Sequence, residues 1–215
     1  KRMTPETKAL VLEMLKVFDP SKVSSVPLEV IRHGRDKQEK ELIESLKFDN
    51  LDKPTEILIK NPVDGYEIPA SVFKPTDAKK DAPIVVFFHG GGWTMCSRQS
   101  HYPPVATLAS KTKTIWISVE YRLAPEFKYK TQVTDYKAAL EWISNNREQF
   151  SSKDAKIGVC GDSAGGHIAA LMGHYYKSIL SYEILIYPVV DLVGDYNSDD
   201  EFKANCYLLT PHMVN

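Results

Sequence analysis

The chain has 215 residues, of which 43% are hydrophobic, and its 27 Lys and Arg residues nearly balance 28 Asp and Glu residues, for a formal net charge of −1 at pH 7. This length and composition suffice for one sizeable hydrophobic core of a globular protein. A net charge so close to zero gives no reason to expect nucleic acid or an anionic membrane surface as a partner.

Cysteine usage indicates the compartment. Cys96, Cys160 and Cys206 are far apart and odd in number, which argues against a disulfide framework and favours a reducing, cytoplasmic location. The printed sequence shows no apolar run long enough to span a bilayer and no signal peptide. An anchor or signal ahead of Lys1 stays open, because the chain does not start with Met. No spacing typical of metal ligands occurs, so we expect no metal and no cofactor.

Residues 1–49 carry helical patterns. Thr4 and Pro5 supply an N-cap and a Pro at the first helical position. The apolar residues that follow at helical spacing, and that we expect to face a core, are Val11, Met14, Leu15 and Phe18. A second helix, with its charges on a solvated face, is predicted around Asp36–Leu46. We therefore expect an N-terminal helical segment at 1–49 and an α/β core at 50–215.

Strand patterns begin near residue 55. Glu56–Lys60 and Tyr66–Phe73 are predicted to form an antiparallel pair around the turn at 62–65. The apolar runs at 84–88 and 114–119 are typical of strands buried on both faces.

A long helix is predicted at Gln132–Phe150, after the second of these runs. Strand-like runs follow at Ile157–Cys160 and at Tyr182–Tyr187. This alternation of strands and helices predicts an α/β fold, a three-layer sandwich with a mostly parallel sheet.

A glycine loop follows the strand predicted at 84–88. It reads His89-Gly90-Gly91-Gly92-Trp93. Glycines let backbone N–H groups approach a ligand without a Cβ in the way. Aimed at a developing oxyanion, each such donor contributes roughly 3–4 kcal/mol of transition-state stabilisation.

The most informative stretch is Gly-Asp-Ser-Ala-Gly-Gly at 161–166, with Ser163 at its centre. A strand-like run precedes it and a helix-like run follows it, as in the sharp strand-to-helix turn that exposes a nucleophilic hydroxyl. In such a site the N–H after the nucleophile, here that of Ala164, is a second oxyanion donor. The alternative is a Gly-rich structural turn capped by Ser.

Three motifs together resemble the hormone-sensitive-lipase-like family of α/β-hydrolases, which includes carboxylesterases and arylacetamide deacetylases. They are His-Gly-Gly-Gly-Trp at 89–93, Tyr-Arg-Leu-Ala-Pro-Glu at 121–126 and Gly-Asp-Ser-Ala-Gly-Gly at 161–166, in the family's order and at roughly its spacing. The resemblance covers about residues 50 to 210. It implies an α/β-hydrolase fold in which the N-terminal helices form part of a cap over the active-site mouth.

The resemblance also implies roles for single residues. Ser163 is the expected nucleophile, and the expected oxyanion hole is formed by Gly90, Gly91 and Ala164. The residues expected to support the site are His89, Gly92, Arg122, Glu126 and Asp162. Among these, Arg122 and Glu126 would brace the loops, His89 would be structural, and Asp162 would form hydrogen bonds within the turn.

The family carries its catalytic acid and His well downstream of the nucleophile, whereas only about fifty residues follow Ser163 here. We therefore interpret the chain as a fragment without the C-terminal strands and without both triad partners, and we expect it to be almost inactive alone. The missing C-terminal portion is a candidate partner as a separate chain. Asp191 is expected to be structural. The histidines, none of which is expected to act as the general base, are His33, His89, His101, His167, His174 and His212.

These patterns predict a serine hydrolase that cleaves short- or medium-chain carboxylic esters through an acyl-enzyme. An amide substrate is the second choice within the same chemistry. The alternative from another class is a non-catalytic binding or structural protein on a hydrolase scaffold, since a fold does not imply a function. The oligomeric state is not indicated.

Overall fold

The computed structural model of the protein describes residues 4–6, 9, 12, 26–34 and 36–191. The described residues from 36 to 190 belong to one compact unit, and those up to 34, with Asp191, belong to a second. In the second unit a short helix, α2 (Leu28–His33), begins after Pro27 and ends at Gly34. The helical stripe predicted between Val11 and Phe18 lies outside the described residues, so the cap segment stays a prediction.

The helix predicted around Asp36–Leu46 is present as α3 (Asp36–Ser45). Its charged residues Lys40, Glu41 and Glu44 are exposed, as expected for a solvated face. This helix belongs to the same compact unit as the sheet and contacts α4 (Tyr102–Thr112). The boundary of that unit therefore falls before α3, whereas the sequence pattern placed it near residue 49.

In the described part of the chain, six strands form one sheet in the order β1-β2-β4-β3-β5-β6. Their bounds are β1 (Thr55–Lys60), β2 (Glu67–Phe73), β3 (Ile84–Phe88), β4 (Ile115–Val119), β5 (Ile157–Asp162) and β6 (Leu180–Ile186). The hairpin β1–β2 is antiparallel and β2 pairs antiparallel with β4, while β4, β3, β5 and β6 run parallel. The predicted hairpin and the predicted mostly parallel sheet are both confirmed.

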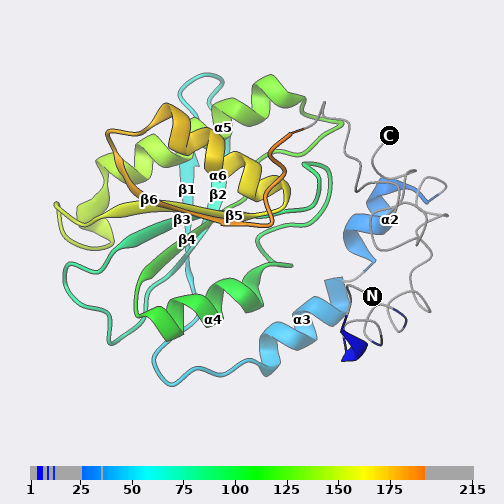
Figure 1. Cartoon of the computed structure of the whole chain (residues 1–215), viewed down its shortest axis with the longest axis horizontal. Coiled ribbons are helices and arrows are strands. Elements are labelled where there is room, and N and C mark those ends of the chain that lie inside the picture. The colour runs from blue at the N-terminus through cyan, green and yellow to red at the C-terminus, as the bar shows by residue number, and fades with distance from the viewer. Residues whose placement is uncertain (1–3, 7–8, 10–11, 13–25, 35, 192–215) are drawn as a thin grey trace. The chain divides into compact units, whose positions relative to one another are not determined.

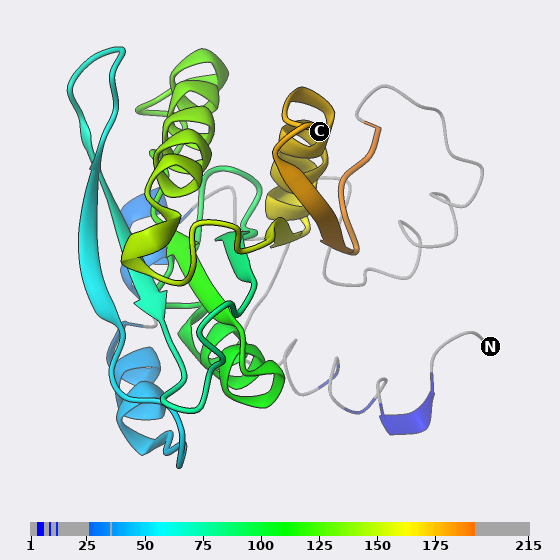
Figure 2. The ribbon, with the colours of Figure 1, turned by 90° about the vertical axis from the view of Figure 1, so that its left-hand side faces the viewer.

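Helices cover both faces of this sheet. Helix α4 lies on one face, whereas α5 (Tyr129–Asn145) and α6 (Ala164–Tyr175) lie on the other (Figure 1). The hairpin β1–β2 forms one edge of the sheet and β6 the opposite edge (Figure 2). This is the predicted three-layer α/β sandwich. It places the carboxyl ends of β3 and β5 next to each other, which is where ligand sites form in parallel sheets.

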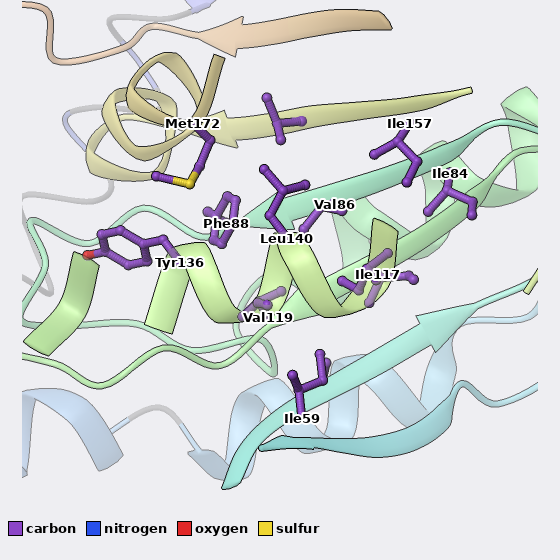
Figure 3. Packing of buried hydrophobic residues seen from close by; sticks show 14 of the residues in the cluster. Ile59, Ile84, Val86, Phe88, Ile117, Val119, Tyr136, Leu140, Ile157 and Met172 are labelled. Atoms are coloured by element: carbon purple, nitrogen blue, oxygen red, sulfur yellow. The ribbon is translucent and has the colours of Figure 1, made fainter. Parts of the chain in front are cut away.

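The core explains why the central strands read as continuous apolar runs. Alternate residues of β3 pack toward opposite faces. Val86 and Phe88 lie in one cluster with Tyr136 and Leu140 of α5 (Figure 3), whereas Val85 and Phe87 belong to a second cluster with residues of α4. Every residue of β3 and β4 is buried, because both of their faces are covered. The two edge strands, β1 and β6, show mostly exposed patterns.

Helix α4 is not indicated by any pattern described above. Pro103 and Pro104 sit in its first turn, where a missing N–H costs nothing. It ends at Lys113, which has a left-handed backbone conformation with φ 55°. The predicted helix at Gln132–Phe150 is real but begins earlier, at Tyr129, and ends at Asn145 before a 3₁₀ turn at Arg147–Gln149.

The described residues contain no helix that is both long and apolar enough to cross a membrane. At the outer edge of the described sheet, Ile184 and Leu185 of β6 are each 39% exposed. The sheet thus presents apolar side chains at this edge within the described part of the chain.

Candidate active site

Ser163 sits in a strained turn between β5 and α6. Its φ of 52° and ψ of −118° lie outside the regions that L-residues ordinarily adopt, at a cost on the order of 1–3 kcal/mol. The turn is held by β6 and the residues after it, since Ser163 N–H donates to Ile186 O over 2.9 Å and Val189 N–H donates to Ser163 O over 3.2 Å. The predicted strand-turn-helix context of Ser163 is therefore present, and its side chain is partly exposed.

The turn requires glycine two positions before and two positions after Ser163. A Cβ on Gly161 would overlap with the backbone of Gly165, and a Cβ on Gly165 would overlap with the carbonyl oxygen of Phe88. These contacts bring the first turn of α6 against the end of β3. The glycines at both positions of the Gly-x-Ser-x-Gly pattern thus serve close packing of the backbone.

The glycine loop begins where β3 ends. Gly90 N–H donates to Asp162 Oδ1 over 3.0 Å, so this donor is already used. Gly91 and Gly92 have φ values of 112° and 59°, which favour glycine, and their N–H groups have no hydrogen-bond acceptor among the described residues. The assignment of Gly90 to the oxyanion hole is therefore not supported by this geometry, whereas Gly91 and Gly92 retain free donors.

Ala164 is the first residue of α6, and its N–H is one of the helix-terminal donors that have no partner within the helix. The positive end of the α6 dipole adds to this donor. Since Gly165 packs on the end of β3, the N-terminus of α6 and the glycine loop belong to one site.

His89 is held in this loop by contacts with Tyr121 and Gly90. It is fully buried, its ring stacks on Tyr121 at 4.4 Å between centroids, and its Nδ1 lies 2.7 Å from Gly90 O. Tyr121 Oη donates to His89 O over 2.7 Å. Burial lowers the pKa of His89 to about 3, so the ring is neutral near pH 7 and Nδ1–H is the donor to Gly90 O.

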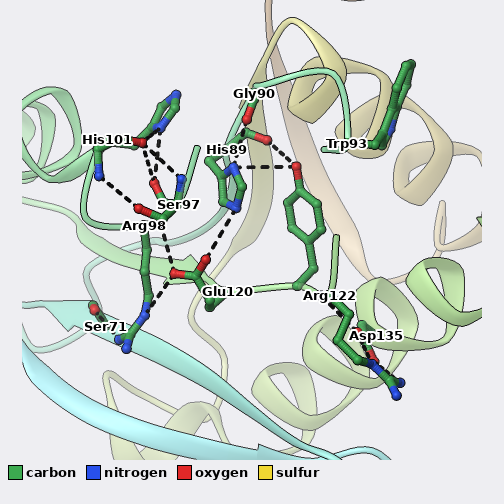
Figure 4. A network of polar contacts seen from close by, with 12 residues as sticks. Ser71, His89, Gly90, Trp93, Ser97, Arg98, His101, Glu120, Arg122 and Asp135 are labelled. Carbon is green, nitrogen blue, oxygen red and sulfur yellow. Dashed lines mark hydrogen bonds and ion pairs between the residues drawn. The ribbon is translucent and has the colours of Figure 1, made fainter. Parts of the chain in front are cut away.

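A polar network continues from His89 to the sheet edge (Figure 4). Glu120 Oε1 lies 3.8 Å from His89 Nε2, and its other oxygen accepts from Arg98 N–H over 3.0 Å and lies 3.2 Å from Arg98 Nε. Arg98 also donates to Ser71 Oγ over 2.7 Å and pairs with Glu56. Burial raises the pKa of Glu120 despite the nearby guanidinium. The network joins the glycine loop to β1 and β2.

Asp162 and His101 form a pair that the sequence analysis did not anticipate. His101 Nε2 lies 3.2 Å from Asp162 Oδ1 and 3.3 Å from Oδ2. Burial alone would raise the pKa of Asp162, but the hydrogen bonds and charge of His101 and the bond from Gly90 outweigh it, so this pKa is lowered. Asp162 forms hydrogen bonds, as predicted, but to the glycine loop and to His101. No sequence pattern predicted this contact of His101, because His101 lies just before α4 and that helix was not predicted.

Arg122 braces the loops at the other side of the site. Its guanidinium donates to both carboxylate oxygens of Asp135 at 2.8 and 2.7 Å and pairs with Asp64 at 2.7 Å. It also lies over the ring of Tyr66, 4.4 Å from its centroid. Arg122 thus links the β1–β2 turn to α5. Glu126 lies exposed in the following loop.

Two other histidines, His167 and His174, lie on α6. His167 Nδ1 lies 2.9 Å from Val189 O, and its ring meets Trp93 edge to face. His174 is exposed on α6, and His212 lies outside the described residues. Among the side chains that the structure describes, none forms a hydrogen bond with Ser163 Oγ. No group of three or more potential metal ligands occurs in the described part of the chain.

A strained Ser between a parallel strand and a helix, facing a glycine loop at the end of the neighbouring strand, defines the α/β-hydrolase class. Residues 85–215 match the family described as "alpha/beta hydrolase fold", and the chain belongs to this family. The match confirms both the predicted fold and the resemblance to the hormone-sensitive-lipase-like group.

Several relatives carry esterase names. Carboxylesterase NlhH of Mycobacterium tuberculosis is 36% identical over 141 residues, which cover 62% of this chain and 44% of that protein. Neutral cholesterol ester hydrolase 1 of Rattus norvegicus is 32% identical over 165 residues, which cover 70% of this chain and 40% of that protein. The matched segments thus span less than half of these curated relatives.

Among solved structures, a hyperthermophilic esterase from the archaeon Pyrobaculum calidifontis superimposes with a TM-score of 0.82 at 29% identity. The match covers 100% of this chain and 68% of that structure. The thermophilic carboxylesterase EstE1, cloned from a metagenomic library, matches with a TM-score of 0.77 at 30% identity, over 88% of this chain and 65% of that structure.

Proposed function

We propose that this chain carries the nucleophile and the oxyanion hole of a carboxylic ester hydrolase. The observation that carries the proposal is the strained backbone of Ser163 beside a glycine loop whose Gly91 and Gly92 N–H groups have no acceptor among the residues that the structure describes. Strain of this kind persists only where the surroundings enforce it, and it is typical of functional positions. The esterase names of the relatives support the same reaction.

The proposed reaction is acyl transfer through an acyl-enzyme. Ser163 Oγ adds to the ester carbonyl carbon while its proton passes to a general base, and the carbonyl oxygen becomes an oxyanion. The N–H groups of Gly91, Gly92 and Ala164 would donate to that oxyanion. Collapse of the tetrahedral species releases the alcohol, which takes up the proton. Water then repeats the sequence and releases the acid.

The general base and its acid partner are proposed to lie outside the described residues, because no described side chain is hydrogen-bonded to Ser163 Oγ. The order nucleophile, acid, His is general for this fold. We expect the acid and the His about 80 to 130 residues beyond Ser163, in the order that the fold requires.

The proposed substrate is an uncharged small-molecule ester with a short or medium acyl chain. Amides of similar size are the second choice, because the same nucleophile and oxyanion donors serve both acyl groups. We also propose a cytoplasmic location, because Cys96, Cys160 and Cys206 are far apart in the sequence and odd in number, which argues against a disulfide framework. Association with a separately produced C-terminal portion stays part of the proposal.

The test uses the full-length protein and a fluorophosphonate probe, which forms a covalent adduct with an activated serine. Wild type should be labelled at Ser163 and should hydrolyse short p-nitrophenyl esters, and Ser163→Ala should lose both properties. Labelling at another serine, or unchanged labelling in Ser163→Ala, would contradict the nucleophile assignment. A folded full-length protein that neither reacts nor hydrolyses any ester would favour the non-catalytic alternative.

A further inference from the structure

Asp162 connects the two segments that the proposed oxyanion hole requires. It lies directly before Ser163 at the end of β5, and its Oδ1 accepts the N–H of Gly90, the first glycine of the loop. Since Gly91 follows Gly90 and Ala164 follows Ser163, the carboxylate of Asp162 fixes the distance between the donors on either side. A displacement of this carboxylate would move the two halves of the site apart.

The carboxylate itself is held by His101. The side chains of His101 and Asp162 are only 16% and 14% exposed, and Nε2 of the ring lies within 3.3 Å of both carboxylate oxygens. The carboxylate accepts hydrogen bonds from the His101 ring and from the Gly90 N–H. A carboxylate this deeply buried is costly without a donor or a cation beside it.

The His101 ring is fixed from its other side as well. Its Nδ1 lies 3.0 Å from Ser100 Oγ and 3.2 Å from Ser97 O, and its ring centroid lies 5.8 Å from that of Phe87. The neighbouring His89 ring, with centroids 5.6 Å apart, closes a further side. The ring therefore cannot turn away from Asp162 without breaking contacts to the loop at 97–100.

We infer that His101 is a positioning residue of the proposed esterase site: by holding the Asp162 carboxylate, it keeps the glycine loop in register with Ser163. This inference rests on the proposed function and extends it to a residue that does not touch the reacting atoms. His101 acts through the chain of contacts from its Nε2 to Asp162 and from Asp162 to the Gly90 N–H.

Two substitutions separate this role from general packing. In His101→Gln the amide nitrogen can take the place of Nε2 and still donate to Asp162. In His101→Asn the shorter side chain can keep contacts near Ser97 and Ser100 but cannot reach the carboxylate. His101→Leu, which fills similar space without a donor, replaces His101→Asn should that variant not fold.

In the full-length protein, His101→Asn is expected to lower kcat by about 10- to 100-fold, less than the roughly 10²- to 10³-fold loss of a whole oxyanion donor. KM should stay within about threefold, because the affected bonds form mainly in the transition state. His101→Gln should keep at least about a third of the wild-type kcat. Amide hydrogen exchange provides the second readout, since Gly90 N–H should exchange at least about tenfold faster in His101→Asn than in His101→Gln.

The inference is overturned if both variants retain wild-type kcat and Gly90 protection. It is also overturned if, in both variants, kcat and the melting temperature fall and KM rises, because that combination would indicate a general packing defect. If the wild-type protein hydrolyses no ester, the proposed function fails, and Gly90 exchange in the two variants still tests the positioning role by itself.

Discussion

Gly165 packs directly on the backbone of Phe88, so closely that a Cβ on the glycine would overlap with the Phe88 carbonyl oxygen. This contact joins the first turn of α6 to the last residue of β3. It therefore joins the helix that starts at the nucleophile to the strand that leads into the glycine loop. The two segments pack backbone against backbone here, whereas at Gly90 they are joined by the side-chain carboxylate of Asp162.

Gly165→Ala should consequently destabilise the protein by about 2–4 kcal/mol, because neither the strand carbonyl nor the helix can yield without moving the site. Gly173→Ala, in the same helix, is the matched control. There the added Cβ would meet the carboxylate end of the exposed Glu183, which can rotate away. That variant should be neutral or gain up to about 1 kcal/mol from helix propensity. Urea unfolding of both variants measures the difference, and equal effects would contradict the argument.

Gly91→Ala should impair catalysis. At φ 112° a Cβ would be strained and would overlap with Met95 O, so the loop must shift and its donor must tilt. Loss of one oxyanion donor should lower kcat by roughly 10²- to 10³-fold. KM should change much less, because the interaction strengthens in the transition state.

Gly92→Ala is the control for this prediction. Its φ of 59° carries a strain of roughly 1–2 kcal/mol, but the nearest atom to the added Cβ, Thr94 Oγ1, is 4.0 Å away. The N–H group remains, so the fall in kcat should be clearly smaller than in Gly91→Ala. Steady-state kinetics on a short p-nitrophenyl ester measure kcat and KM for both variants. If Gly91→Ala kept kcat within about threefold of wild type, Gly91 would not belong to the oxyanion hole.

Asp135→Ala should cost about 3–5 kcal/mol of stability, because it leaves the guanidinium of Arg122, whose side chain is only 7% exposed, without its bidentate partner. Asp64 still pairs with Arg122 but lies at the surface. The control is Lys113→Ala, which breaks an ion pair with Asp77 in which the two side chains are 61% and 40% exposed. That change should cost at most about 1 kcal/mol. A similar loss in both variants by chemical denaturation would contradict the difference in burial.

Much of the fold was predictable because local patterns and tertiary packing agree. Every residue of β3 is buried, and its apolar run, bounded by turn residues, predicts a buried strand. The antiparallel hairpin β1–β2 follows from its turn residues. Helix α4 was not predicted, because Pro103 and Pro104 in its first turn resemble loop residues until the helix after them is known. Prolines are compatible with a helix only in its first turn, and the sequence alone does not show that these two lie there.

The candidate site was also predictable only in part. The strained turn at Ser163 could be predicted, since Gly161 and Gly165 leave room that only glycine provides. The pairing of Gly90 with Asp162 could not, because it joins residues 72 positions apart through a backbone N–H that has no sequence signature. The same holds for His101, because folding brings the residue just before α4 beside the last residue of β5.

His89 makes the stability of the protein depend on pH in a defined direction. Burial lowers its pKa to about 3 in the folded state, below the ordinary value of 6.5 expected in the unfolded chain. Between these values the unfolded state binds one more proton than the folded state, so stability falls as pH falls. The contribution is fully present above about pH 6.5 and is lost progressively toward about pH 3. Its slope is about 1.4 kcal/mol per pH unit for one proton.

His89→Gln should remove this dependence, because glutamine does not titrate. The free energy of unfolding, measured by urea titration at several values between about pH 4.5 and pH 6, should fall more steeply in wild type than in the variant as the pH is lowered. The two profiles should run parallel above the range in which His89 titrates in the unfolded chain. Profiles that stay parallel down to the lower end of this range would show that His89 is protonated in the folded protein. That result would contradict both its burial and its role as a neutral donor to Gly90 O.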